Sequence, residues 1–121
     1  MTTKPKHIAV VDDDESVREA LPDLLRSFGF TAEPYNSAEA FLNAAAFLYS
    51  DGMILDIAMP GMTGPELYKE LSRRGQPVPT IFITALKDEL LRTRLLNDGA
   101  LECLFKPFSD DELLQALGAI P

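Results

Sequence analysis

The chain has 121 residues, 46% of them hydrophobic, and 19 acidic against 11 basic residues give it a formal net charge of −8. This size suits one domain with one buried core, so we expect residues 1–121 to form a single domain. The acidic balance excludes direct nucleic-acid binding by phosphate neutralisation, which requires a basic surface.

The single cysteine, the single histidine and the hydropathy of the chain exclude further classes of protein. Cys103 has no partner for an internal disulfide, and His7 alone cannot supply the ligands of a zinc site. No apolar run approaches the roughly 20 residues of a membrane helix, and the first six residues lack the apolar stretch of a secretory signal. We therefore expect a cytoplasmic protein that does not use a membrane, in which oxygen ligands favour magnesium, manganese or calcium.

Strand and helix patterns alternate five times along the chain. In chain order, strands are predicted near 7–12, 31–35, 51–55, 79–83 and 101–105, and helices near 15–28, 37–49, 64–74, 87–98 and 110–118. Short apolar runs between polar residues are typical of buried parallel strands. The pattern predicts an α/β fold with a doubly wound, five-stranded parallel sheet in the flavodoxin-like order 2-1-3-4-5.

Two prolines test this assignment. Pro34 lies inside the second strand, where proline is tolerated only at a sheet edge, and the proposed order places that strand at an edge. Pro22 lies inside the first predicted helix, where its missing N–H and its ring predict a bend.

Small residues mark the predicted helix ends. Gly29 and Gly99 follow helical stretches and are expected to be C-terminal caps, while Ser37 and Ser109 stand where a hydroxyl can cap a helix amino end. Glu112 follows Ser109 at capping-box spacing.

Polar residues follow four of the five predicted strands. Asp12 and Asp13 follow the first strand, Asp56 the third, Thr84 the fourth and Lys106 the fifth. Because parallel strands end at one edge of the sheet, we expect these side chains to share one shallow pocket. Three clustered carboxylates favour a bound cation, and a carboxylate can attack phosphorus to form an aspartyl phosphate. The pattern predicts a site for magnesium and a phosphoryl group.

Each of these residues also has an ordinary structural explanation. An aspartate can cap the next helix, a threonine forms strands well, and a lysine before proline is usually exposed to solvent. Asp14 and Glu15 are interpreted in this structural way, as first-turn residues that complement the dipole of the first helix. The combination in order, rather than any single residue, favours the functional interpretation.

Four motifs resemble those of the CheY-like receiver domain of two-component response regulators. They are VVDDD at 10–14, LDIAMPGMTG at 55–64, ITA at 83–85 and KPF at 106–108. The resemblance covers essentially the whole chain. The stretches LDIAMPGM at 55–62 and FKPF at 105–108 are most similar to the FixJ-like branch of the family. It implies a flavodoxin/CheY-like (βα)5 fold, with residues 1–121 as one receiver domain and no output domain in this chain.

The resemblance implies specific roles in the pocket. Asp56 would be the phosphoacceptor, Asp13 a direct ligand of Mg²⁺, and Asp12 an acidic residue acting on the metal through water. The backbone carbonyl of Ala58 would add a further ligand, and Mn²⁺ could substitute for Mg²⁺.

The resemblance also implies a switch. Thr84 would be the switch hydroxyl and Lys106 the ammonium that pairs with the phosphoryl group, aimed by a cis Lys106–Pro107 bond. In the family an aromatic switch residue commonly stands three positions before the lysine, but here that position is Cys103. A thiol is too small to act by swinging inward, so Phe105 or Phe108 could replace it, or Cys103 could simply be a buried small residue.

The predicted fourth helix carries more leucines than one helical face holds, namely Leu86, Leu90, Leu91, Leu95 and Leu96. One stripe should pack on the sheet, and the surplus predicts an exposed surface for a partner or a phosphorylation-dependent homodimer, unless the whole helix is buried. Arg92 and Arg94 favour an exposed outer face.

Three functions remain open. In the first, a sensor histidine kinase phosphorylates Asp56, and the domain controls an output domain or partner protein through the face of the fourth helix, fifth strand and fifth helix. Such a domain catalyses only its own phosphorylation and dephosphorylation. The second, a magnesium-dependent phosphatase, is disfavoured because Ala58 stands where such enzymes carry a second aspartate. The third, a scaffold that is not phosphorylated, is disfavoured because Asp13, Asp56 and Lys106 are all present.

Overall fold

The computed structural model describes residues 4–121, which form one five-stranded parallel sheet flanked by helices. The strands are β1 (His7–Val11), β2 (Thr31–Tyr35), β3 (Gly52–Asp56), β4 (Thr80–Thr84) and β5 (Glu102–Phe105). The helices are α1 (Glu15–Ser27), α2 (Ala38–Asn43), α3 (Gly64–Arg73), α4 (Glu89–Asn97) and α5 (Asp110–Leu117), with a 3₁₀ turn η1 (Ala46–Leu48). The strand order is β2-β1-β3-β4-β5 with every pair parallel, which confirms the predicted fold class.

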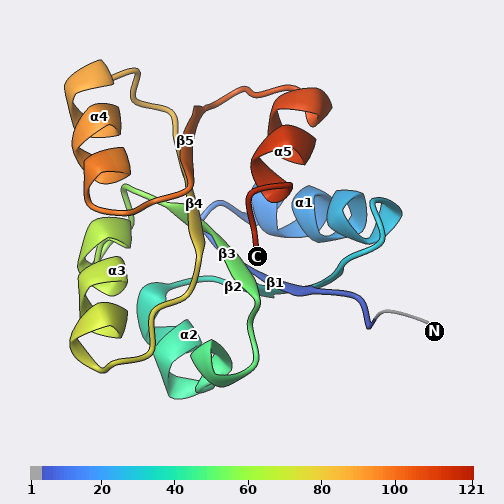
Figure 1. Cartoon of the computed structure of the whole chain (residues 1–121), viewed down its shortest axis with the longest axis horizontal. Helices are drawn as coiled ribbons and strands as arrows, with labels where there is room; N and C mark the ends of the chain where they lie inside the picture. Colours follow the sequence, from blue (N-terminus) through green and yellow to red (C-terminus); the bar gives the residue numbers. More distant parts are fainter. Residues whose placement is uncertain (1–3) are drawn as a thin grey trace.

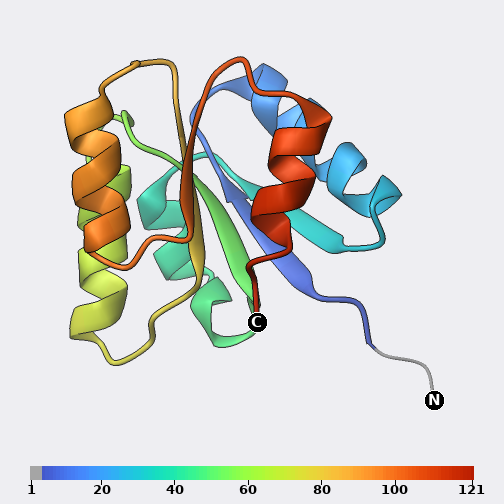
Figure 2. The same cartoon turned by 45° about the horizontal axis from the view of Figure 1, so that its top comes forward.

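Helices cover both faces of the sheet (Figure 1 and Figure 2), α1 and α5 on one face and α2, α3 and α4 on the other. Successive strand residues point to opposite faces, so Ile8 packs with the α1 and α5 side chains and Ala9 with those of α2 and α3. Along β3 and β4 every residue is buried. Two hydrophobic clusters, one on each face, therefore fix the strands whose carboxyl ends carry the polar residues.

Both prolines lie in the elements predicted for them, Pro34 in β2 and Pro22 in α1. β2 is an edge strand, so Pro34 interrupts no central ladder. Pro22 is buried inside α1, which continues past it to Ser27. The bend at Pro22 stays a prediction.

The helix ends follow the predicted chemistry. Gly29 and Gly99 adopt φ values of 96° and 110° after α1 and α4, a left-handed region that glycine enters without a Cβ penalty. Ser37 caps α2 by accepting a hydrogen bond from the amide of Ala40. Ser109 caps α5 within a full capping box.

The predicted second helix is too long. α2 ends at Asn43, Ala45 adopts a left-handed φ of 51°, and a 3₁₀ turn follows. The break brings Ala46 and Phe47 onto the core, where the Phe47 ring lies 6.4 Å from that of Phe41. Tertiary packing of these two side chains overrides the local preference for a longer helix.

The predicted fourth helix starts too early. α4 begins at Glu89, because Asp88 adopts an extended conformation and its side chain accepts a hydrogen bond from the Leu91 amide as an N-cap. Leu86 therefore lies in the loop before α4. None of the helices in residues 4–121 has both the length and the apolar character needed to cross a membrane.

Ser109→Ala should lower the free energy of unfolding by about 1 kcal/mol. The Ser109 hydroxyl accepts from the Glu112 amide at 3.0 Å, and Glu112 accepts from the Ser109 amide at 3.2 Å, so the change removes half of the capping box. Urea unfolding measures the difference. Ser72→Ala, at an exposed position within α3, is the matched control, and equal stability changes in both variants would contradict the assigned cap.

Candidate functional site

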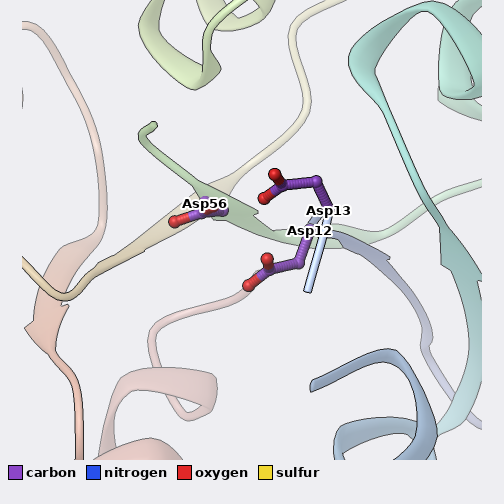
Figure 3. A group of neighbouring side chains, drawn as sticks. All are labelled: Asp12, Asp13 and Asp56. Carbon is purple, nitrogen blue, oxygen red and sulfur yellow. The ribbon is translucent and has the colours of Figure 1, made fainter. Parts of the chain in front are cut away.

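Three carboxylates meet where β1 and β3 end (Figure 3). Carboxylate oxygens of Asp12, Asp13 and Asp56 all lie within 4.8 Å of one another. Asp12 is completely buried, Asp56 is 6% exposed, and Asp13 is exposed to solvent. Hard oxygen atoms at this spacing are the donor set that Mg²⁺ or Mn²⁺ prefers, so the residues present fit the implied metal.

Lys106 contributes a positive charge to this cluster from the end of β5. Its Nζ donates to Asp12 Oδ2 at 2.9 Å and lies 3.6 Å from Asp56 Oδ1. Burial disfavours the ammonium, but the hydrogen bond and charge of Asp12, together with the charge of Asp56, outweigh it and raise the pKa of Lys106. The ammonium thus lies closer to Asp12 than to Asp56, so it neutralises the charge of Asp56 less completely.

Asp56 is the poorly neutralised carboxylate of the cluster. Burial and the negative charges of Asp12 and Asp13 together raise its pKa to about 7, and the positive charge of Lys106 offsets only part of this increase. An ionised Asp56 in this place is therefore costly and gains from any added positive charge.

Two hydrogen bonds from the residues after β1 hold Asp12 in place. The Asp14 amide donates to Asp12 Oδ1 at 2.9 Å, and Arg18 Nη1 donates to the Asp12 carbonyl oxygen at 3.0 Å. Asp14 is the N-cap of α1 and not a first-turn residue as predicted, since its Oδ1 accepts from the Ser16 amide at 2.9 Å. Hydrogen bonds from Ser16 lower the pKa of Asp14.

Thr84 closes the pocket on the β4 side. It is 2% exposed, and its Oγ1 accepts a hydrogen bond from the Leu86 amide at 3.0 Å, which leaves the hydroxyl hydrogen to donate. Asp56, Ala58, Thr84 and Lys106 line one open hollow of about 590 Å³ together with the acidic turn. The structure thus brings together all the residues predicted for the pocket, and the Lys106–Pro107 bond is cis as expected.

Cys103 is a buried residue of β5. It is 2% exposed and packs in the cluster that contains Phe82 and Leu95. Burial raises the pKa of its thiol to about 11, so the thiolate is scarce at neutral pH. The interpretation as a buried small residue is confirmed, while Phe105 and Phe108 are only partly buried.

The leucines around α4 divide as the pattern suggests. Leu95 is buried, whereas Leu90 and Leu86 are 80% and 63% exposed, the former on α4 and the latter in the preceding loop. Arg94 is exposed as expected. Arg92 is only partly exposed, because its guanidinium bonds to β5.

Two residues that shape the pocket carry no predicted role. Glu39 on α2 accepts a hydrogen bond from the Met62 amide at 3.0 Å and so anchors the loop that contains Ala58. Gly64 begins α3 directly against the Asp56 backbone, where a Cβ would overlap the Asp56 carbonyl oxygen. A glycine at the first helical position is a usable signal of such close approach, but nothing in the sequence indicates the contact of Glu39.

The chain matches one protein family and several characterised relatives. Residues 8–118 match the family described as the response regulator receiver domain. The response regulator protein TmoT of Ectopseudomonas mendocina is 37% identical over 97% of this chain, and the transcriptional regulatory protein FixJ of Bradyrhizobium diazoefficiens is 40% identical over 93%. The crystal structure of FixJ-N superposes with a TM-score of 0.86 at 31% identity, covering 98% of this chain and 94% of that one.

The chain spans about half the length of the curated relatives that it matches, 53% of TmoT and 55% of FixJ. Fold, strand order and pocket agree with the resemblance found in the motifs. The match covers most of the chain and includes the β1, β3, β4 and β5 ends. The chain belongs to the response regulator receiver domain family, the signalling domain of two-component systems.

Proposed function

We propose that this receiver domain accepts a phosphoryl group from a sensor histidine kinase on Asp56 and thereby changes conformation to control an output domain or partner. The observation that carries the proposal is the position of Asp56. Its buried carboxylate lies between two other carboxylates and an ammonium, and its raised pKa reflects a need for added positive charge.

The transfer requires little from the protein beyond position and charge. An Asp56 carboxylate oxygen attacks phosphorus, the bond from phosphorus to the donor histidine nitrogen breaks, and the electron pair leaves with that nitrogen. Lys106 stabilises the negative charge on the phosphoryl oxygens. The Thr84 hydroxyl, whose hydrogen is free to donate, binds one of these oxygens after transfer.

The metal of the proposal is Mg²⁺, for which Mn²⁺ can substitute. Asp13 and Asp56 would bind it directly, the Ala58 carbonyl would add a ligand, and Asp12 would act through water. When bound, the ion supplies positive charge to three carboxylates that otherwise have only the Lys106 ammonium beside them among the described residues. That added positive charge would lower the cost of ionising Asp56, which must be ionised to act as a nucleophile near neutral pH.

The proposal extends to partners and cell compartment. The α4–β5–α5 face, with exposed Leu90 and Leu114, is the proposed contact for an output domain, a partner or a second phosphorylated copy. We place the domain in the cytoplasm, where histidine kinases donate phosphoryl groups. It turns over no foreign substrate, because Ala58 provides no second acid two residues after Asp56.

Intact-mass measurement after incubation with acetyl phosphate and MgCl₂ tests the function. The chain should gain the mass of one phosphoryl group, Asp56→Asn should gain none, and Glu19→Gln, which removes an exposed carboxylate of α1, should behave as the unchanged chain. Omitting the metal should abolish the gain. Absence of any addition would favour the scaffold, and steady hydrolysis of a phosphate ester would favour the phosphatase.

A further inference from the structure

Arg92 of α4 binds the open edge of β5. Its Nε donates to the Cys103 carbonyl oxygen at 3.1 Å, and its Nη2 lies 3.0 Å from Glu102 Oε1. The same Glu102 oxygen accepts from the Cys103 amide at 2.9 Å. β5 is an edge strand, so these two side chains satisfy backbone groups that no further strand among residues 4–121 covers.

The guanidinium is held from several sides. It lies 6.0 Å from the centre of the Phe105 ring, and its Nη1 lies 3.6 Å from Glu89 Oε2. The Arg92 side chain is 36% exposed and that of Glu102 31%, so solvent screens the pair only in part. Hydrogen bonding to Glu102 raises the pKa of Arg92, which stays charged.

A continuous series of hydrogen bonds joins this contact to the phosphorylation pocket. Thr84 Oγ1 accepts from the Leu86 amide, and the Leu86 carbonyl oxygen accepts from the Asp88 amide at 3.0 Å. Asp88 then caps α4, accepting from the Leu91 amide through its side chain and from the Arg92 amide through its carbonyl oxygen. All of these bonds lie within the nine consecutive residues from Thr84 to Arg92.

The phosphoryl group and this series share one atom, Thr84 Oγ1, which accepts from the Leu86 amide and can donate its hydrogen to a phosphoryl oxygen. If the Thr84 side chain moves towards a phosphoryl oxygen on Asp56 to make that bond, Oγ1 either draws the Leu86 amide with it or loses it, and in both cases the loop before α4 rearranges. The contact of Arg92 with β5 opposes that movement, because a shift of α4 along the strand strains both bonds of the guanidinium.

We propose that Arg92 is a positioning residue that locks α4 onto β5 in the unphosphorylated conformation, so that it, rather than the side chain at position 103, couples the pocket to the α4–β5–α5 face. The inference rests on the proposed function of Asp56 and Thr84. A contact that exists in only one of two conformations shifts the equilibrium between them by the free energy of that contact. Removing the Arg92 contact should therefore favour the phosphorylated conformation.

Calorimetric titration of the magnesium-loaded chain with beryllofluoride, which mimics a phosphoryl group on a carboxylate, tests the lock. Arg92→Ala should bind beryllofluoride about fivefold more tightly than the unchanged chain. Arg92→Lys, which keeps the charge but not the planar pair of donors, should fall between them. Arg94→Ala, an exposed arginine of the same helix, is the matched control and should leave the affinity unchanged.

A merely structural role for Arg92 would lower thermal stability without tightening the binding of beryllofluoride. Unchanged or weaker binding by both Arg92→Ala and Arg92→Lys, with normal binding by the unchanged chain, would overturn the lock and leave the phosphoacceptor intact. Failure of the unchanged chain to bind beryllofluoride would instead contradict the role of Asp56 and remove the inference with it. Glu102→Gln, which weakens the same contact from β5, should shift the affinity in the same direction by a smaller factor.

Discussion

Replacing Lys106 with Met is expected to slow phosphorylation of Asp56 by acetyl phosphate about a hundredfold or more while tightening Mg²⁺ binding about tenfold. The two effects have opposite signs because one charge has two roles. The ammonium would stabilise the transferred phosphoryl oxygens, but it also repels a cation from the carboxylates that it contacts at 2.9 and 3.6 Å. Fully buried Asp12 loses its cationic partner at the same time, so the metal-free variant should also unfold more easily.

Calorimetry measures the Mg²⁺ affinity, and the rate of mass gain measures phosphorylation. Lys69→Met removes an exposed ammonium on α3 and serves as the control that should leave both quantities unchanged. Weaker Mg²⁺ binding in Lys106→Met would show that the ammonium organises the metal site instead of competing with it.

Asp56→Asn should stabilise the metal-free fold by about 2–4 kcal/mol above pH 8. The folded-state pKa of Asp56, about 7, lies above its unfolded value of 3.8, so between these values the folded chain holds a proton that the unfolded chain has released. Its contribution to stability is therefore fully present below pH 3.8 and is lost as the pH rises through 7. Asparagine carries no charge at any of these values, so the advantage of the variant should grow over the same interval.

Urea unfolding in EDTA at a series of pH values measures this difference. Adding MgCl₂ should reduce it, since the unchanged chain gains stability from the bound ion and the variant has lost one ligand. Glu19→Gln, an exposed carboxylate of α1, should show no comparable pH dependence. A difference that stays constant from pH 4 to pH 8 would contradict the raised pKa.

The location of the pocket could be predicted because it follows from local patterns and one rule of topology. Apolar runs identify the strands, the alternation with helices makes them parallel, and parallel strands end at one edge. Asp12, Asp13, Asp56, Thr84 and Lys106 therefore had to gather once the strand order was known. Caps at Ser37 and Ser109 were predictable for the same reason, since a cap depends on neighbours within four residues.

Contacts between distant segments could not be predicted. The early end of α2 depends on where Ala46 and Phe47 find space in the core, and the anchor of Glu39 on Met62 joins residues 23 positions apart. Arg92 appeared to be one more charged residue on an outer face, but its partner Cys103 is brought within reach only when α4 packs beside β5. Composition and periodicity contain no information about such pairings.

Local sequence patterns predict the fold class and the residues of the pocket, because periodicity and strand-end chemistry depend only on neighbouring residues, and Pro34 fits the proposed strand order because it needs a sheet edge. The distribution of charge inside the pocket and the connection of the pocket to the outer face depend on the folded structure. Lys106 lies closer to Asp12 than to Asp56, and burial of Asp56 raises its pKa, as a result of packing between segments 44 to 94 residues apart in sequence. Electrostatic effects of burial and side-chain contacts across β5 arise only when those segments are assembled.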